Sequence, residues 1–333
     1  MAAHEASQMV VEPGSSLGGP APVSPSFDQE RAWVFFGGEQ RRYGDSRIGL
    51  MTHALHYGTA CFEGIRAYWN ESREQLYIFR ALEHFQRLHQ SAAILTMKVD
   101  YSPEELVEIT VQLLRRNQFR CDTYIRPLVY KSAEEIGVRL HGLADGFFIY
   151  AQPYGEYLDR SQGLRCMVSS WRRIDDNAAP ARAKISGTYV NSALAKSEAA
   201  EHGLDEAIVL GQDGHVCEGS AENLFLIRKG TLITPAVSDN ILEGITRSTL
   251  MQLWSEDLGL PVVERPVDRT ELYVADEVIL CGTGAQISAV VEIDRRAVGS
   301  GKPGPYAQQL DQMYGKLVRA ELEKYREWCT PVY

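Results

Sequence analysis

Runs of apolar residues alternate with segments of helical periodicity in the first half of the chain. Apolar residues recur at helical spacing over 82–95. A second helix is predicted from Ser102 to about residue 118, because Pro103 suits the first helical position and Glu105 completes a capping box with Ser102. Short runs rich in β-branched and aromatic residues predict strands at 32–36, 75–80, 123–130 and 146–153.

The second half shows the same alternation. Two apolar runs, 223–228 and 231–235, flank Lys229 and Gly230, which predicts a β-hairpin. Strands and helices that alternate in this way predict an α/β (α+β) protein, and the length favours two domains. The other predicted elements are strands at 164–171, 206–210, 262–267, 277–281 and 287–293, and helices at about 190–202, 245–258 and 305–328.

Composition indicates where the domains meet. The stretch 155–163 is polar, bounded by glycines and weakly periodic. We expect it to cross from a smaller domain at 28–154 to a larger one at 164–333. Residues 1–27 are rich in glycine, proline, serine and alanine, and they lack the basic and apolar regions of a secretory signal. Such a composition predicts a disordered N-terminal arm.

Charge and composition narrow the range of partners. The formal net charge is −10, and no cluster of lysine and arginine suits a nucleic acid. No run approaches the roughly 20 apolar residues that span a bilayer, and the six cysteines lie far apart, as in reduced cytoplasmic proteins. His53 and His56 are three residues apart, but no third ligand has matching spacing, so we expect no metal site. Small molecules are the expected partners.

Lys184 has unusual neighbours for a lysine. Ala181 and Ala183 precede it, and Gly187 follows three residues later. Small residues of this kind would let a planar group approach the backbone closely. A partly buried structural lysine explains this segment alone equally well.

Three features of the second half add to this picture. Glu218 lies among small residues, where it could face a cation. Gly244 precedes a predicted helix, and free amides at a helix N-terminus bind anions. Gly282 and Gly284 follow an apolar strand and could expose two further amides. Each feature alone is also explained by an ordinary turn or helix start. With Lys184, they are what a phosphorylated pyridine aldehyde would require.

Ordered motifs extend this constellation from about Trp33 to Ile293. They are His56-Tyr57-Gly58-Thr59, Phe62-Glu63-Gly64-Ile65-Arg66, His84-Phe85, Arg87-Leu88, Tyr124-Ile125-Arg126-Pro127-Leu128, Lys184 with Tyr189, Glu218-Gly219, Glu222-Asn223, Phe225, Ile241-Leu242, Gly244-Ile245-Thr246-Arg247, Gly282-Thr283 and Ala285. This order resembles the branched-chain aminotransferase family of fold-type IV pyridoxal-phosphate enzymes. The resemblance implies a D-amino acid aminotransferase-like architecture, with a small α/β domain, a larger barrel-like α/β domain, and assembly as a homodimer.

The resemblance implies pyridoxal 5′-phosphate as the cofactor and gives residues their roles. Lys184 would hold the cofactor as a Schiff base and, once released by substrate, would act as the base. Glu218 would keep the pyridine nitrogen protonated, and Tyr189 would hydrogen-bond the phenolic oxygen. Arg87 would hold the phosphate. The remaining cofactor residues implied are Leu242, Ile245, Thr246 and Thr283.

The resemblance also implies that branched-chain L-amino acids (Leu, Ile, Val) and 2-oxoglutarate use one pocket in turn, by a ping-pong mechanism through a pyridoxamine form. The amides of Gly284 and Ala285 would bind the α-carboxylate. Arg126, close to Tyr124, would bind the distal carboxylate of glutamate, although a surface arginine at a strand end is the commoner fate. The loop 136–138 would reach the pocket of the partner subunit. The implied apolar wall consists of Tyr57, Phe62, Val138, Tyr154 and Tyr157.

Other functions stay open at this point. The same fold hosts D-amino acid transaminases, R-selective amine transaminases and aminodeoxychorismate lyases, so only the substrate-side residues can choose the reaction. Arg126 and Phe62 favour the branched-chain transaminase. By the resemblance, Gly284 stands where many relatives have alanine and Tyr154 where some have tryptophan, and both departures concern substrate preference. A binding protein that lost catalysis is a further alternative, which the presence of Lys184 disfavours.

Overall fold

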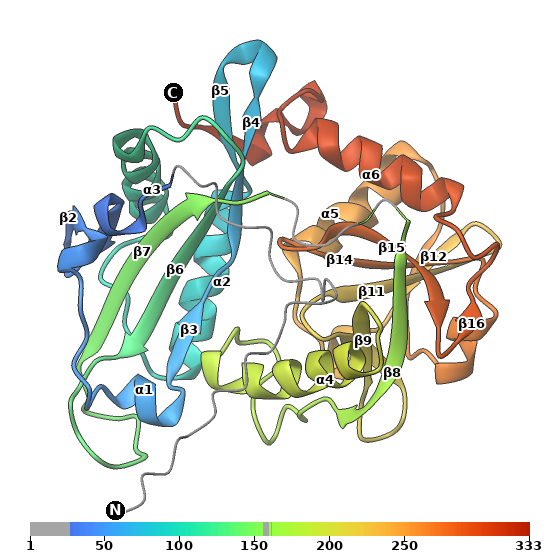
Figure 1. Cartoon of the computed structure of the whole chain (residues 1–333), viewed down its shortest axis with the longest axis horizontal. Coiled ribbons are helices and arrows are strands. Elements are labelled where there is room, and N and C mark those ends of the chain that lie inside the picture. Colours follow the sequence, from blue (N-terminus) through green and yellow to red (C-terminus); the bar gives the residue numbers. More distant parts are fainter. Residues whose placement is uncertain (1–26, 156–159, 161) are drawn as a thin grey trace, which may run out of the picture.

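Two β-sheets with helices packed on them make up the protein (Figure 1). The computed structural model describes residues 27–155, 160 and 162–333. The predicted disordered arm, apart from residue 27, therefore lies outside the described residues, as does part of the predicted crossing at 155–163. The predicted architecture of two α/β domains agrees with this arrangement.

The first sheet takes its strands from the first half of the chain, with one exception. Its strand order is β17-β5-β4-β6-β7-β1-β2, and β3 pairs with β6. The bounds are β1 Trp33–Phe36, β2 Glu39–Arg42, β3 Ala60–Phe62, β4 Ile65–Asn70, β5 Gln75–Phe79, β6 Thr123–Lys131, β7 Asp145–Pro153 and β17 Cys329–Pro331, with helices α1 His53–Tyr57, α2 Ala81–Ile94 and α3 Pro103–Asn117.

The capping box predicted for the second helix is present. The Ser102 hydroxyl accepts a hydrogen bond from the Glu105 amide at 3.1 Å, and the Glu105 carboxylate accepts one from the Ser102 amide at 2.7 Å. This satisfies two of the free amides at the start of α3. Apolar side chains of α2 and α3, such as Phe85, Leu88 and Leu113, are fully buried in the core beneath the first sheet.

The second sheet has the order β10-β9-β8-β15-β14-β11-β12-β13, and β16 pairs with β15. Adjacent residues of its strands face opposite sides. Leu224 and Leu280 pack in one apolar cluster, whereas Phe225 and Ile279 pack against α5 and α6 in another. The bounds are β8 Leu164–Arg172, β9 Glu206–Leu210, β10 Val216–Gly219, β11 Asn223–Arg228, β12 Thr231–Thr234, β13 Val262–Glu264, β14 Glu277–Gly282, β15 Gln286–Ile293 and β16 Arg296–Ala297, with helices α4 Tyr189–Glu201, α5 Ile245–Gln252 and α6 Pro305–Leu317.

The predicted hairpin is confirmed as β11 and β12, which pair antiparallel. Its two turn residues, Lys229 and Gly230, have φ angles of +50° and +76°. Left-handed conformations at both central positions suit the right-handed twist of the flanking strands.

The predicted helix at 305–328 is wrong beyond residue 317. Helix α6 ends at Leu317, Ala320 has a φ of +57°, and a 3-10 turn at Glu323–Trp328 leads into β17. Strand β17 pairs with β5, so the C-terminal end of the chain crosses back to the first sheet (Figure 1). A left-handed residue breaks the helical ladder, and the apolar residues after it pack on the first sheet instead.

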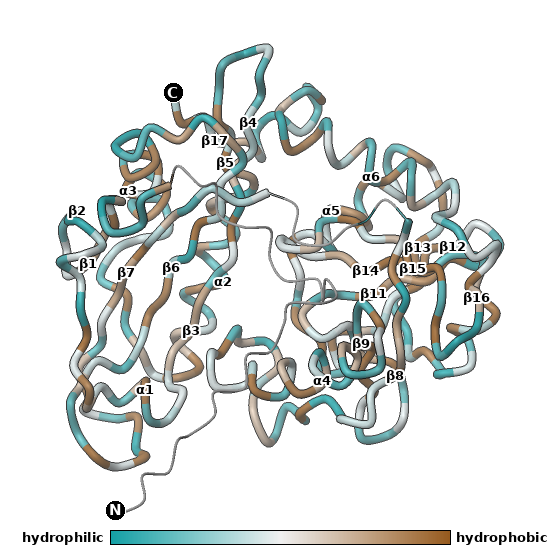
Figure 2. Tube along the Cα trace, in the orientation of Figure 1, coloured by the Kyte–Doolittle hydropathy of each residue, from teal (hydrophilic) through white to brown (hydrophobic). Residues whose placement is uncertain are grey.

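Smaller differences concern two other elements. The predicted strand at 262–267 ends at Glu264, and the predicted helix at 245–258 becomes a π-helical turn at Leu253–Asp257 after α5. Apolar residues concentrate along the strands of both sheets (Figure 2). None of the helices within the described ranges is long and apolar enough to cross a membrane.

Candidate active site

A cavity of about 590 Å³ is lined by residues from both sheets. This volume suits a small-molecule ligand. The cavity gathers every residue that the resemblance implied for the cofactor, and most of those implied for the substrate. These are Arg87, Lys184, Tyr189, Glu218, Leu242, Ile245, Thr246 and Thr283 for the cofactor, and Phe62, Tyr124, Arg126, Tyr154, Gly284 and Ala285 for the substrate.

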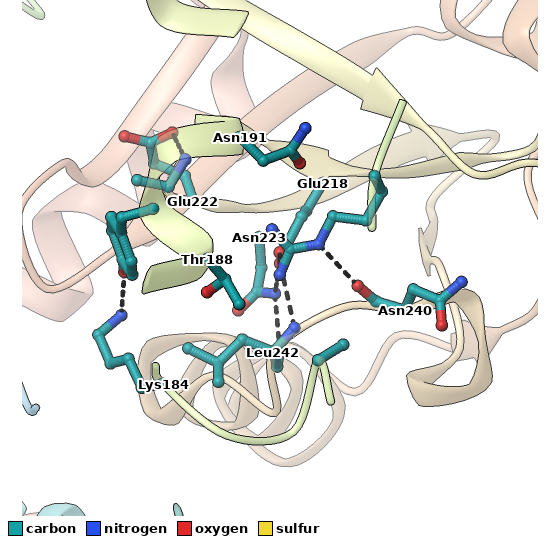
Figure 3. A network of polar contacts seen from close by, with 12 residues as sticks. Lys184, Thr188, Asn191, Glu218, Glu222, Asn223, Asn240 and Leu242 are labelled. Atoms are coloured by element: carbon teal, nitrogen blue, oxygen red, sulfur yellow. Dashed lines mark hydrogen bonds and ion pairs between the residues drawn. The ribbon is translucent and has the colours of Figure 1, made fainter. Parts of the chain in front are cut away.

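Lys184 lies where the two halves of the chain meet. Its amide donates to the Ser91 hydroxyl at 3.1 Å, and its carbonyl accepts from the Phe62 amide at 3.0 Å. The Nζ atom donates to the hydroxyl of Tyr189, the first residue of α4, at 2.7 Å (Figure 3). Backbone bonds therefore fix the lysine, and its amine points to a phenol.

Glu218 is a buried carboxylate on β10, only 5% exposed. Arg173 contacts one of its oxygens at 2.8 Å, and the other accepts from the Asn223 side chain at 2.9 Å and the Leu242 amide at 3.2 Å (Figure 3). Burial raises the pKa of Glu218, although the charge of Arg173 and the Leu242 amide oppose that rise. A cation brought into the cavity beside Glu218 would favour its charged form.

The start of α5 forms an anion-binding corner. Gly244 is its N-cap and has no side chain to bond the first amides, those of Ile245 and Thr246. A Cβ atom on Gly244 would lie 1.9 Å from the Asn223 Oδ1 atom, so only glycine fits there. Free amides at a helix N-terminus attract a phosphate.

Arg87 completes this corner, and hydrogen bonds to Glu63 and Glu243 fix its guanidinium. Its Nε and Nη2 atoms donate to the two oxygens of Glu63 at 2.7 and 2.8 Å, and its Nη1 atom donates to the Glu243 carbonyl at 2.7 Å. Glu63 is fully buried. Burial opposes its charge, yet the charges and hydrogen bonds of Arg87 and His84 hold the pKa of Glu63 well below its ordinary value. Glu63 therefore fixes Arg87 as a cation.

Arg126 lines the cavity and lies against aromatic rings. Its Nη2 and Nε atoms donate to the Tyr124 hydroxyl at 2.6 and 3.2 Å, and its guanidinium lies 4.2 Å from the centre of the Phe62 ring. The Tyr124 and Tyr154 rings are 5.1 Å apart. The arginine is thus satisfied by a phenol and a ring face without a carboxylate among the contacts described, which leaves it able to bind an anion.

Two predicted substrate residues, Tyr57 and Val138, are not among the described residues that line the cavity. Tyr57 is 37% exposed and its hydroxyl accepts from the Gly137 amide at 3.2 Å, whereas Val138 is 78% exposed. Tyr157 lies outside the described residues.

The sequence interpretation missed two charged residues of the cavity wall. Arg173 follows directly after β8 and contacts Glu218, and no pattern in the sequence indicates that contact. Glu222 was part of a motif but received no role. Burial and the nearby charge of Glu206 raise the pKa of Glu222.

Comparisons with known proteins agree with this geometry. The amino-transferase class IV family matches residues 60–293. A probable branched-chain-amino-acid aminotransferase of Aquifex aeolicus is 50% identical over 301 residues, which cover 90% of this chain and 97% of that protein. The crystal structure of a branched-chain aminotransferase from Thermoproteus uzoniensis with norvaline has a TM-score of 0.87 and 42% identity, covering 91% of this chain and 99% of that chain.

A further relative is the T.th. branched-chain amino acid aminotransferase, solved in complex with N-(5′-phosphopyridoxyl)-L-glutamate. It has a TM-score of 0.86 and 39% identity, and covers 92% of this chain and all of that chain. The chain therefore belongs to the class IV aminotransferases and, within them, to the branched-chain-amino-acid aminotransferase family.

Proposed function

We propose that the enzyme transfers the amino group between branched-chain L-amino acids and 2-oxoglutarate in two half-reactions of a ping-pong sequence, with pyridoxal 5′-phosphate as cofactor. One observation carries this proposal. The cavity brings together the Lys184 amine, the aromatic ring of Phe62 and the guanidinium of Arg126, which lies over that ring. The T.th. relative has been solved in complex with N-(5′-phosphopyridoxyl)-L-glutamate, which carries an acidic side chain, and with 4-methylvaleric acid, which carries a branched apolar chain.

The donor set of the cavity fits pyridoxal phosphate. Lys184 offers an amine for the aldehyde, and Tyr189 a hydroxyl for the phenolic oxygen. Glu218 offers a buried carboxylate for the pyridine nitrogen, while Leu242 presents its amide to that carboxylate. Arg87, the amides of Ile245 and Thr246, and the hydroxyls of Thr246 and Thr283 would hold the phosphate. The glycine at 244 supports this fit, because a Cβ atom there would lie 1.9 Å from the Oδ1 atom of Asn223, whose side-chain amide donates to Glu218.

Each residue then has a physical task. Bound pyridoxal phosphate supplies an electron sink for the electrons of the substrate Cα–H bond. Lys184 moves the Cα proton, and Tyr189 orients its amine through the 2.7 Å hydrogen bond. Glu218 keeps the ring nitrogen protonated, because its buried charge is stabilised by a cation. Arg173 and Asn223 hold Glu218 in place.

On the substrate side, the amides of Gly284 and Ala285 would bind the α-carboxylate. Phe62 and Tyr154 contact apolar side chains, and Arg126 pairs with the distal carboxylate of glutamate or 2-oxoglutarate. When leucine occupies the pocket, the Tyr124 hydroxyl satisfies Arg126. One wall thereby serves two unlike side chains.

We further propose that the enzyme is a cytoplasmic homodimer. Ile136 and Val138 are 88% and 78% exposed, although both are large apolar side chains. Exposed apolar groups that gather on a surface mark an interface. The loop that carries them would reach the cavity of the second subunit, where Tyr57 and Val138 would complete the substrate wall.

A panel of half-reactions tests the proposed function. We expect L-leucine alone to convert the cofactor to its amino form and to release 4-methyl-2-oxopentanoate, and 2-oxoglutarate alone to reverse that spectral change. D-Leucine and (R)-1-phenylethylamine should react far more slowly. A faster half-reaction with either of these amines would contradict the proposal and favour a related class IV activity.

A further inference from the structure

His53 is a buried histidine that the proposed mechanism does not use. It begins helix α1 and has no exposed surface. Its Nδ1 atom contacts the Thr59 hydroxyl and its Nε2 atom contacts the carbonyl of Gly137, both at 2.7 Å. Because a carbonyl can only accept, Nε2 carries the proton, and in the neutral ring Nδ1 accepts from Thr59. The imidazole is therefore fixed in orientation and bonded to a loop 84 residues further along the chain.

The same helical turn holds the other polar group of Gly137. The Gly137 amide donates to the Tyr57 hydroxyl at 3.2 Å, and Tyr57 lies four residues after His53. The rings of His53 and Tyr57 are 4.6 Å apart. The His53 amide also donates to the carbonyl of Ala133, at 2.8 Å, where the loop begins. Helix α1 thus clamps the loop at two points.

The clamp has an unusual consequence for the residues beside Gly137. Ile136 and Val138 are among the most exposed large apolar residues in the described part of the chain, at 88% and 78%. Gly137 has a φ of +144°, a conformation that side chains rarely adopt. The glycine is held to the body of the protein while two apolar side chains are directed outwards. Such an arrangement suits insertion into another surface.

We expect the surface that receives the 136–138 loop to belong to a second copy of this chain. The motif residues Tyr57 and Val138 do not line the cavity of their own chain, whereas the other described substrate residues do. The substrate wall is therefore incomplete in one chain. We propose that His53 is a positioning residue that acts across the subunit interface, because it holds the 136–138 loop in the shape that completes the partner subunit's substrate wall. This inference rests on the proposed homodimer.

Mixed dimers test whether His53 acts across the interface. Chains with two different affinity tags are co-expressed, and dimers that carry both tags are purified as holoenzyme. A Lys184→Ala chain paired with a wild-type chain has one working site, and the loop that reaches this site belongs to the Lys184→Ala chain. Adding His53→Phe to the Lys184→Ala chain should lower kcat/KM for leucine roughly 10-fold, mainly through KM, since a small misplacement at a distance weakens substrate positioning. His53→Phe on the working chain should leave kcat/KM unchanged.

His56 provides the matched control. It lies on the same helical turn, is exposed, and contacts only the Leu50 carbonyl among the described hydrogen bonds, at 2.9 Å. His56→Phe should change neither mixed dimer. His53→Gln keeps a donor near the Nε2 position and should restore part of the loss. Equal losses in both mixed dimers, loss only from the working chain, or no loss in either would overturn the inference.

Two further outcomes, a variant that does not form dimers and an active monomer, can be distinguished from the results of the mixed dimers. If His53→Phe prevents dimers from forming, Gly137→Ala takes its place, because a Cβ there meets no atom within 4 Å and changes only the backbone preference. It should lower kcat/KM in the same mixed dimer only, and an equal effect in both would overturn the inference. A fully active monomer would contradict the proposed homodimer and with it the role of His53, whereas the proposed transamination would stand or fall by the half-reaction panel.

Discussion

At the scale of single residues, the cavity is built from charged groups that hold one another in place. Glu63 accepts hydrogen bonds from Arg87, Arg173 pairs with Glu218, and the Tyr124 hydroxyl accepts a hydrogen bond from Arg126. The motifs predicted the groups that face the ligand but not the groups behind them. A supporting residue such as Arg173 has no characteristic spacing in the sequence, because its role arises only when β8 and β10 are brought together in the fold.

The attachment of the cofactor gives the first prediction. Among the described residues that line the cavity, Lys184 is the one lysine, and its amine contacts the Tyr189 hydroxyl. Borohydride reduction of the holoenzyme followed by peptide mapping should therefore find the phosphopyridoxyl label on Lys184. Lys196, which contacts Glu206 at 2.5 Å, is a natural control and should stay unlabelled. A label on any other lysine would contradict the assignment.

Glu218 gives a second prediction. In Glu218→Gln the amide cannot stabilise a protonated ring nitrogen, so removal of the Cα proton should slow on the order of 10²-fold or more. Stopped-flow single turnovers with leucine measure this step, and the cofactor should remain bound. Glu243→Gln, which changes a half-exposed carboxylate, should leave the rate unchanged. Turnover close to that of the wild type would remove Glu218 from the mechanism.

Glu63 predicts a pH-dependent stability. Its pKa in the folded protein is lower than its ordinary value of 4.5, so its ion pair with Arg87 stabilises the fold fully above pH 4.5. That stabilisation is lost as the pH falls through the folded pKa. Glu63→Gln should lower the free energy of unfolding by about 3–5 kcal/mol at pH 7, since a buried guanidinium loses its partner. Denaturant titrations should show this difference shrinking below pH 4.5, and a constant difference would exclude the ion pair as its cause.

At the scale of elements, local signals predicted local structure well. The capping box predicted the start of α3, and the two turn residues predicted the β11–β12 hairpin. Strand β4 was missed because five of its six residues are buried, so it lacks the alternation of a half-buried strand. The end of α6 was missed because Leu317 is followed by apolar residues whose burial depends on distant β5.

The start of α5 allows a prediction about the phosphate corner. Gly244→Ala would place a Cβ 1.9 Å from the Asn223 Oδ1 atom, and Asn223 bonds Glu218. We expect the affinity for pyridoxal phosphate to fall roughly 10-fold, as when one charge-assisted hydrogen bond is lost. Gly315→Ala in α6 is the control, because its Cβ meets no atom within 4 Å. Titration of the apoenzyme with pyridoxal phosphate measures the affinity of both variants. An unchanged affinity in Gly244→Ala would contradict the proposed role of the start of α5 in binding the phosphate.

At the scale of the whole molecule, the two sheets are joined at the cavity and again at the C-terminus. Lys184 bonds Ser91 and Phe62 of the first half, and β17 adds a strand to the first sheet. The sequence predicted two domains and their approximate order. It could not predict the return of the chain after α6, since strand pairing between distant segments leaves no local pattern.

The central claim is that one cavity accepts both an apolar and an acidic side chain, with Arg126 as the group that reconciles them. Arg126→Ala removes the partner of the distal carboxylate, and such a loss costs about 2–5 kcal/mol. Single-turnover kcat/KM for 2-oxoglutarate should therefore fall roughly 30-fold or more, whereas the leucine half-reaction should fall much less. Equal losses in the two half-reactions would show that Arg126 is structural or binds the α-carboxylate common to both substrates, and would contradict the account.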